Sequence, residues 1–307
     1  MAQSTVLRIG TRGSPLALVQ ARAVRDHLVS ALGCAPDAIE LKIIRTTGDV
    51  IVDRPLAEEG GKGLFTKEIE EGLLRGDIDL AVHSAKDMPT FLPDGLVLSA
   101  CLEREDPRDV FVSRKAGSVQ ELPRQAKVGT ASLRRQAIMK RVRPDLEVAP
   151  LRGNVETRLR KLDEGEADAI VLALAGLRRL GLESRATRIM DAAEFLPAAG
   201  QGAIAIETRE ADAWTREAVA RIDHADTSIA VAAERAFLAV LDGSCKTPIA
   251  AHASLAGDIL QFRGLILRPD GSAAHETSVA GPVREAVTIG CDCGAALRQY
   301  AGPGFFD

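Results

Sequence analysis

An apolar run that ends in two ionisable side chains is the most informative feature of the sequence. Residues 80–82 are apolar, and Lys86 and Asp87 follow shortly after them, ahead of Pro89. Helical patterns precede such β-type runs, which favours a parallel sheet, and open α/β sheets bind ligands at the carboxyl ends of their strands. A carboxylate beside an ammonium at that edge indicates site chemistry, although a solvated pair at a turn fits this segment equally well.

Arginines stand at or before three expected helix N-termini. The helix dipole disfavours a cation there by about 0.3–1 kcal/mol unless an anion is shared, and free backbone N–H groups point at such an anion. A single arginine of this kind is more often a surface residue. Three matching cases in a chain of net charge −4 predict sites for anionic groups. They are Arg12 ahead of Ser14, Arg134 and Arg135 after Ser132, and Arg152 ahead of Asn154, and the three polar residues are also ordinary N-caps.

Cys245 lies in a polar loop with Lys246 beside it. A nearby cation favours the thiolate, so this cysteine is either a nucleophile or a covalent attachment point, while a buried structural cysteine fits equally well. The five cysteines are scattered and odd in number, so no disulfide framework is expected. The Cys291-Asp292-Cys293 segment lacks a second ligand pair, so we expect no metal.

A glycine-rich stretch at 60–63 precedes an expected helix but lacks the spacing and the Lys-Ser/Thr ending of a P-loop, which excludes a nucleoside triphosphate site. It suits a lid over an anionic ligand, or it is simply a mobile loop.

Length and composition describe an ordinary globular chain. Its 307 residues, 46% hydrophobic and 27% charged, indicate about two or three domains. A pI of 5.8 argues against a general nucleic-acid binder. We expect no membrane span, because no stretch approaches about 20 apolar residues, and no secretion signal, and therefore predict a cytoplasmic enzyme or binding protein.

Two stretches of the chain share an α/β pattern. Strands are expected at 6–9, 39–44 and 78–82 with helices at 15–32 and 64–74. Further strands are expected at 109–112, 127–129, 146–148 and 169–172, with helices from Leu133 and from Val155. The pattern predicts two similarly built lobes facing a cleft. A short strand at 203–206, a helix at 227–241 capped by Gly243 and strands at 249–253 and 260–267 complete the chain.

Seven motifs in a fixed order make the chain resemble the porphobilinogen deaminase (hydroxymethylbilane synthase) family from about Val6 to at least Ile266. They are RIGTRGSPLA at 8–17, GGKGLF at 60–65, HSAKDMP at 83–89, EREDPRD at 103–109, GTASLRR at 129–135, LRGN at 151–154 and PAAGQG at 197–202. The loop at Cys245 departs from the pattern, since the family usually has glycine where Ser244 stands.

The resemblance implies an α/β fold of three domains, the first two like type II periplasmic binding protein lobes and the third a small α+β domain. The expected domains are 1–101 plus 199–219, 102–198, and 220–307, with the strand at 203–206 as the return to the first.

The resemblance also implies a dipyrromethane cofactor bound through Cys245 as a thioether, and the head-to-tail condensation of four porphobilinogen molecules with loss of ammonia. It further implies that water then releases linear hydroxymethylbilane, and that the chain is a transferase of tetrapyrrole biosynthesis. Asp87 would stabilise positive charge on pyrrole nitrogen and assist proton transfer. Residues implied to bind carboxylates or support that binding are Arg12, Ser14, Lys86, Thr130, Ser132, Arg134, Arg135, Arg152, Arg158 and Arg179, with Lys62 and Phe65 as parts of a lid.

Two other functions fit the residues. Arginine-rich lobes would also suit a non-catalytic anion-binding protein, and Cys245 would also suit a transferase that attacks its substrate directly. We further expect a monomer that binds no nucleic acid and passes its product to a uroporphyrinogen-forming synthase.

Overall fold

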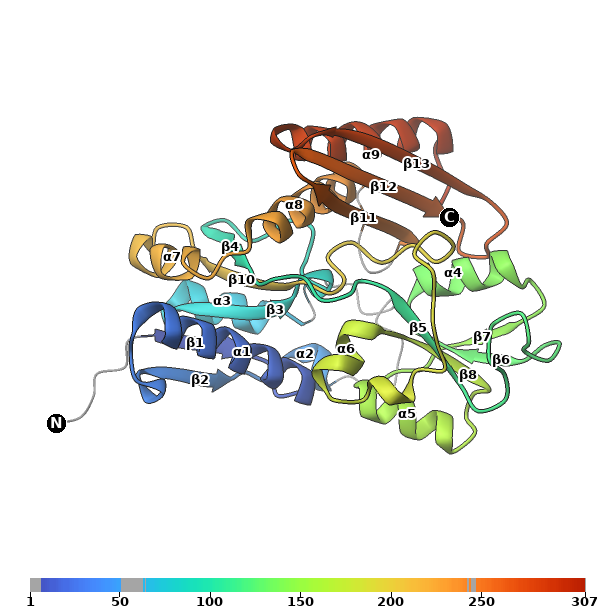
Figure 1. The fold of residues 1–307 in the computed structure, drawn as a ribbon, viewed down its shortest axis with the longest axis horizontal. Coiled ribbons are helices and arrows are strands. Elements are labelled where there is room, and N and C mark those ends of the chain that lie inside the picture. The colour runs from blue at the N-terminus through green and yellow to red at the C-terminus, as the bar shows by residue number, and fades with distance from the viewer. Residues whose placement is uncertain (1–6, 51–62, 64, 242, 244–246, 307) are drawn as a thin grey trace. The chain divides into compact units, whose positions relative to one another are not determined.

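The computed structural model describes residues 7–50, 63, 65–241, 243 and 247–306. The chain divides into two compact units, and each is considered by itself (Figure 1). Unit 1 holds Met1–Glu105 and Ala203–Ser228, and unit 2 holds Asp106–Gly202 and Ile229–Asp307. In the described part of the chain no helix has the length and apolarity needed to cross a membrane.

Unit 1 is built on a five-stranded sheet in the order β2-β1-β3-β10-β4. Its strands are β1 (Leu7–Thr11), β2 (Ile39–Ile43), β3 (Leu80–Ser84), β4 (Leu96–Cys101) and β10 (Ile204–Arg209). The first three run parallel, and β10 runs antiparallel to both β3 and β4. The three strands predicted for the first part of the chain therefore run parallel as expected, and the sheet as a whole is mixed because the returning strand β10 enters from the opposite end.

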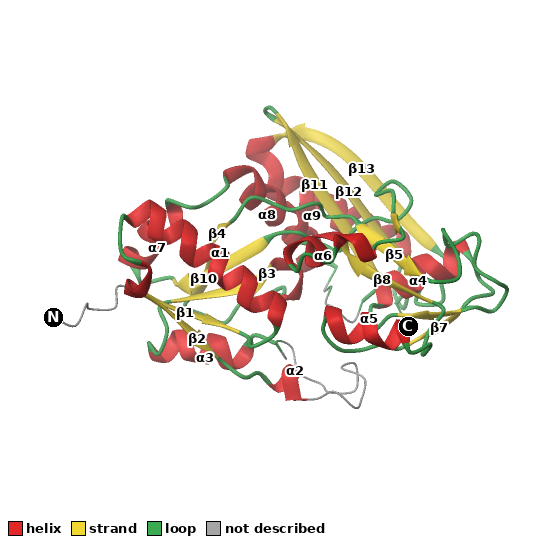
Figure 2. Ribbon diagram, turned by 60° about the horizontal axis from the view of Figure 1, so that its bottom comes forward, coloured by secondary structure: helices red, strands yellow, loops and turns green. Residues whose placement is uncertain are grey.

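Helices cover both faces of this sheet. The helices of unit 1 are α1 (Pro15–Leu32), α2 (Thr47–Val50), α3 (Lys67–Arg75) and α7 (Ala213–Ala220). Figure 2 shows α1 lying across β1 and β3, and its residues Val24 and Leu28 are fully buried against the sheet. On the other face, Ile69 and Leu73 of α3 pack on Ala81 of β3. Helices packed on both faces therefore bury the sheet and hold the ends of its strands in place.

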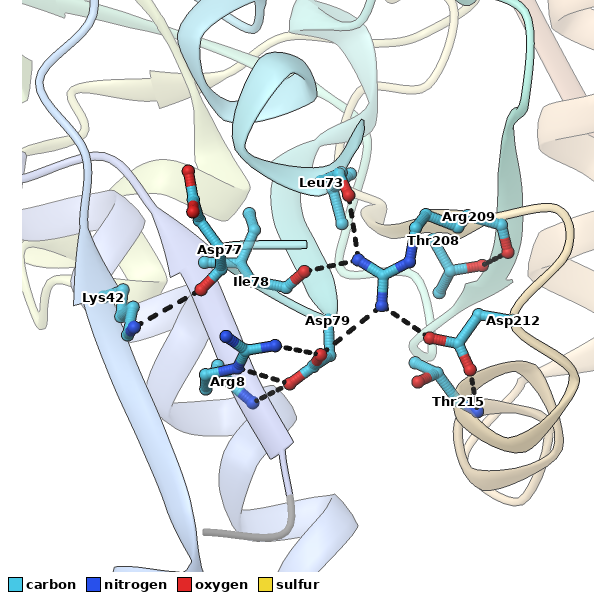
Figure 3. Close-up of polar contacts among 10 residues, drawn as sticks. All are labelled: Arg8, Lys42, Leu73, Asp77, Ile78, Asp79, Thr208, Arg209, Asp212 and Thr215. Carbon is cyan, nitrogen blue, oxygen red and sulfur yellow. Dashed lines mark hydrogen bonds and ion pairs between the residues drawn. The ribbon is translucent and has the colours of Figure 1, made fainter. Parts of the chain in front are cut away.

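Polar contacts hold the amino end of β3 (Figure 3). Asp79, just before the strand, accepts hydrogen bonds from the backbone N–H and the guanidinium of Arg8 at 2.7–2.9 Å. Arg209, at the end of β10, donates to the carbonyls of Leu73 and Ile78 and lies 3.4 Å from Asp79. Burial would raise the pKa of Asp79, but the Arg8 and Arg209 guanidinium groups outweigh it and lower that pKa. The network therefore ties three strands and α3 together at the edge opposite to the residues that follow β3.

The first part of unit 2 repeats the architecture of unit 1. Its sheet has the order β7-β6-β8-β5-β9, in which β6 is parallel to β7 and β8, while β5 is antiparallel to β8 and β9. The strands are β5 (Asp109–Ser113), β6 (Lys127–Gly129), β7 (Glu147–Ala149), β8 (Ala169–Ala173) and β9 (Arg188–Ile189). The helices are α4 (Leu133–Val142), α5 (Val155–Asp163) and α6 (Leu174–Arg179). The prediction of two similarly built lobes is confirmed, since both sheets place one antiparallel strand at the fourth position.

The second part of unit 2 is an antiparallel sheet with helices on one side. The sheet has the order β11-β12-β13, and α9 lies along β12 and β13 (Figure 1). The elements are α8 (Ala225–Val240), β11 (Ile249–Ala256), β12 (Ile259–Leu267), β13 (Ala274–Pro282) and α9 (Ala286–Ala301). Phe237 of α8 and Phe262 of β12 are fully buried, with ring centroids 5.4 Å apart. This small α+β part has its own core, as the fold prediction required.

Candidate functional site

A small pocket of about 60 Å³ lies in unit 1 where β1 and β3 end. Parallel strands bring their carboxyl ends to one edge of the sheet, so the residues that follow β1 and β3 meet there. The polar side chains that line it are Arg12, Ser14, Gln20, Thr66, His83, Ser84 and Asp87. Asp87, Arg12 and Ser14, three of the site residues predicted from the sequence, all line this pocket, and their roles stay predictions.

Asp87 ends a short 3-10 turn, Ala85–Asp87, that follows β3 directly. The Ala85 N–H donates to the Ala203 carbonyl at 3.0 Å, which fixes the start of the turn against the strand that returns to the sheet. Asp87 is exposed, and Lys86 in the same turn is half-buried. The carboxylate of Asp87 is thus held at the pocket while staying open to solvent and to a ligand.

Arg12 directly follows β1, and its guanidinium lies 4.2 Å from the centre of the Phe65 ring. A cation over an aromatic face gains about 0.5–1 kcal/mol at an exposed site, so Phe65 helps to orient the guanidinium. Ser14 caps α1, since its Oγ accepts a hydrogen bond from the Ala17 N–H at 3.3 Å. Strand β1 and helix α1 together therefore present a cation and a hydroxyl to the pocket.

Four polar pocket residues, Gln20, Thr66, His83 and Ser84, were not assigned a role from sequence. Gln20 lies on the buried face of α1, and its side chain and that of Ser84 exchange hydrogen bonds of 2.9 and 3.2 Å. His83, inside β3, is 5% exposed and has its Nε2 atom 3.2 Å from an Oε2 atom of Glu207. A glutamine four residues before Val24 on an apolar helix face is the signal that could have revealed Gln20, because a buried amide needs a polar partner.

Arg134 and Arg135 lie in the first turn of α4 and are buried against Asp109 at the start of β5. Arg134 donates to one oxygen of Asp109 at 2.7 Å, and Arg135 donates to the other at 2.7 Å. Burial would raise the pKa of Asp109, but the two guanidinium groups outweigh it and lower that pKa to about 2. The carboxylate that these arginines hold in the structure is therefore the chain's own, and their binding of a substrate carboxylate stays a prediction.

Arg152 and Arg158 flank the start of α5. Asn154 caps this helix by accepting a hydrogen bond from the Thr157 N–H at 2.8 Å, and Arg158 donates from Nε to the Gly153 carbonyl at 2.7 Å. Gly153 has φ +119°, and a Cβ there would lie 2.6 Å from the Thr157 methyl carbon. Only glycine fits this turn without strain, and the turn places both arginines, each half-buried, at one helix end.

The remaining predicted residues of unit 2 make local contacts. Thr130 accepts a hydrogen bond from the Ser132 N–H at 3.2 Å, and Ser132 caps α4 through the Arg135 N–H at 3.4 Å. Arg179, in the last turn of α6, donates to the Gly202 carbonyl at 2.6 Å. Lys62 and Cys245 lie outside the described residues, so their predicted roles stay predictions.

Family models match nearly the whole chain. The model for "porphobilinogen deaminase, dipyromethane cofactor binding domain" matches residues 7–217, and the model for the C-terminal domain of the same enzyme matches residues 228–299. Porphobilinogen deaminase of Nitrobacter winogradskyi is 60% identical over 298 residues, which are 97% of this chain and 94% of that protein. Porphobilinogen deaminase of Nitrobacter hamburgensis is 59% identical over the same shares.

Solved structures that resemble the chain include two bacterial binding proteins. A periplasmic substrate-binding protein of an ABC transporter from Coxiella burnetii is 14% identical with a TM-score of 0.45, covering 71% of this chain and 92% of that one. A nutrient-binding protein from Burkholderia cenocepacia bound to methionine is 15% identical with a TM-score of 0.43, covering 71% and 91%. On the sequence relationships, this chain belongs to the porphobilinogen deaminase family and makes hydroxymethylbilane from porphobilinogen on a dipyrromethane cofactor.

Proposed function

We propose that Asp87 is the catalytic carboxylate of this reaction and that Arg12 and Ser14 bind a carboxylate in the same pocket. The observation that supports this most directly is the pocket itself, which gathers a carboxylate, a guanidinium and hydroxyls at the strand ends. Loss of ammonia from porphobilinogen leaves positive charge shared with a pyrrole nitrogen. A carboxylate fixed beside that nitrogen stabilises the charge and accepts a hydrogen bond from the N–H group.

The donor set fits a dipyrromethane, which carries acetate and propionate side chains as well as pyrrole N–H groups. Arg12 supplies N–H donors in a planar fork that suits a carboxylate, and Ser14 supplies a hydroxyl beside it. Asp87 supplies the acceptor that a pyrrole N–H needs. When bound, the dipyrromethane supplies the free pyrrole carbon to which the first substrate unit is joined.

Unit 2 offers a second group of cations for substrate carboxylates. Arg152 and Arg158, brought together at the start of α5, are the strongest candidates there, because the Asn154 cap and the Gly153 turn fix their backbone. Arg134 and Arg135 would keep their pairing with Asp109 and offer their remaining donors. Lys86, Thr130, Ser132 and Arg179 complete the proposed binding residues, with Lys62 and Phe65 in the lid.

We further propose that Cys245 carries the cofactor through a thioether. The intact mass of the purified protein should exceed the sequence mass by two pyrrole units, and the Cys245→Ser variant should lack that excess. A cysteine that attacks each substrate directly would instead show no permanent adduct.

The family relationship also supports proposals about the oligomeric state, the location, the fate of the product and the domain bounds. We propose a monomeric transferase of the cytoplasm whose unstable product passes to a uroporphyrinogen-forming synthase. We also propose three domains at 1–101 plus 199–219, 102–198 and 220–307, for which the separate core of the β11-β12-β13 sheet is support.

The steady-state rate of an Asp87→Asn variant tests the role of the carboxylate. Removing one preorganised group that stabilises developing charge costs about 10²–10³ in kcat. Asp94→Asn is the matched control, because Asp94 is also exposed and lies seven residues further along the same unit outside the pocket. Equal rates in the two variants would remove Asp87 from the mechanism.

A further inference from the structure

Three titratable side chains meet under α3, on one face of the sheet of unit 1. His83 of β3 is directly opposite Ala205 of β10, and Glu207 is directly opposite Ala81. Opposite residues of an antiparallel pair share a face, as do residues two apart, so His83 and Glu207 point the same way. Helix α3 packs on that face through Ile69 and contributes Glu70. The exposed fractions of His83, Glu207 and Glu70 are 5%, 0% and 6%.

The polar atoms of this cluster lack ordinary partners. Among the described residues, both carboxylate oxygens of Glu207, Oε1 of Glu70 and Nε2 of His83 form no well-aligned hydrogen bond. The closest approach is that of His83 Nε2 to Glu207 Oε2, at 3.2 Å. Buried polar atoms without partners are uncommon in folded proteins. The protonation of one of these side chains would supply the missing hydrogen bond. A proton on one carboxyl group would turn an acceptor into a donor.

Electrostatics favours that proton. Two ionised carboxylates in a dry site repel each other, and each loses its hydration. Burial raises the pKa of Glu70, and the negative charges of Glu207 and Glu68 raise it further, against a hydrogen bond from Thr66 and the opposing influence of His83. The other charged group on this side of β10, Arg209, is held by the carbonyls of Leu73 and Ile78.

The cluster is joined to the pocket at two points. His83 itself lines the pocket together with Asp87. The Thr66 hydroxyl lies near enough to the Glu70 carboxyl group to lower its pKa, its Oγ also lies 3.5 Å from the Gly63 carbonyl, and Thr66 lines the pocket. The neighbouring Phe65 carries the ring against which the Arg12 guanidinium lies. The position of the Arg12 side of the pocket therefore depends on what Glu70 can accept and donate.

We propose that Glu70 is kept in its protonated, neutral form beside Glu207 and His83, and that this buried acid is a positioning residue for the Thr66–Phe65–Arg12 side of the pocket. The neutral carboxyl group accepts from Thr66 through its carbonyl oxygen and offers its proton to the carboxylate of Glu207. Its effect on the reaction rests on the proposed function of this pocket, whereas its protonation does not.

Infrared difference spectra of the whole protein test the protonation. Wild type minus Glu70→Gln at neutral pH should show the C=O stretching band of a buried carboxylic acid, which lies apart from the amide band. Glu207→Gln should weaken or remove the band, because Glu70 then ionises more easily. No acid band in the wild type, or a band that persists in Glu70→Gln, would overturn the proposal. The Asp87→Asn variant should keep the band while losing turnover, so a failure of the Asp87 assignment would be seen separately.

Kinetics of two Glu70 variants test the positioning. Glu70→Ala removes the carboxyl acceptor of the Thr66 hydroxyl and leaves it only the Gly63 carbonyl, so KM should rise by about three- to tenfold, the range expected for one neutral hydrogen bond, with kcat little changed. Glu70→Gln has the shape of the neutral acid and retains an acceptor, so its KM at neutral pH should equal that of the wild type. Above neutral pH, its KM should change less with pH than the KM of the wild type does. A KM in Glu70→Gln as high as in Glu70→Ala would show that the negative charge is what matters, and would contradict a neutral Glu70.

Discussion

Replacing Asp109 by asparagine removes the counter-charge of two buried arginines. The exposed fractions of Arg134 and Arg135 are 4% and 5%, and Asp109 is fully buried between them. Gln201 also donates to Asp109, at 3.0 Å. Asparagine offers one acceptor oxygen and no charge, so both guanidinium groups would stay buried without an anion.

The size of the loss follows from this burial. Removing one partner of a buried ion pair costs about 3–5 kcal/mol of unfolding free energy, because the other charge is left uncompensated. The depression of the Asp109 pKa from 3.8 to about 2 gives a smaller figure of roughly 2–3 kcal/mol at about 1.4 kcal/mol per pH unit. The larger value is expected for the variant, since asparagine removes the charge and also places an N–H₂ group against the arginines.

Urea unfolding followed by circular dichroism measures the change. The control is Asp163→Asn, whose partner Arg185 lies 2.9 Å away in an exposed pair, for which a loss of less than about 1 kcal/mol is expected. A loss in Asp109→Asn no larger than in this control would refute the view that the Asp109 pair supports the core of unit 2.

Three further predictions concern the same contacts. Arg152→Leu should stall elongation and leave enzyme-bound intermediates, seen as a changed series of masses; an unchanged series and rate would count against a role in binding substrate carboxylates. The lowered pKa of Asp79 contributes stability that is present above its unfolded pKa of about 3.8 and is lost as the pH falls through its lower folded pKa. Asp79→Asn should therefore flatten the acid side of a plot of melting temperature against pH. An acid side that is the same in variant and wild type would exclude this contribution. Gly153→Ala should lower unfolding free energy by about 1–3 kcal/mol, because φ is +119° and the new Cβ would meet the Thr157 side chain; equal chemical unfolding curves for variant and wild type would contradict the strain.

Elements with a local signal were predicted best. Helices α1, α4 and α5 begin at Pro15, Leu133 and Val155 as expected, because a capping side chain precedes each. Strand β6 was also predicted with the right bounds. Local hydrogen bonding and periodicity decide these cases, and both can be read from neighbouring residues.

Elements defined by distant partners were misplaced or missed. Strand β3 begins and ends two residues later than expected, because its pairing with β1 and β10 sets its bounds. Strand β13 was not predicted, since it is half-exposed with little apolar alternation and gains its hydrogen bonds from β12 alone. Helices α6, α7 and α9 and strands β4 and β9 were likewise not predicted.

The same limit applies to the candidate site. Motifs singled out Arg12, Ser14 and Asp87, and the structure places all three on one pocket, while their roles stay predictions. No local pattern relates Asp109 to Arg134, or Glu207 to His83, because each pair is joined only by the folding of segments far apart in the chain. Buried polar partners of this kind have to be seen in the structure.

The mass spectrum of Asp87→Asn, recorded before and after addition of porphobilinogen, tests the central claim most directly. If Asp87 is the catalytic carboxylate, the variant should carry the mass of the dipyrromethane cofactor and show almost no further growth, while wild type and Asp94→Asn form a series of heavier species. A variant that builds the same series at the wild-type rate would contradict the account.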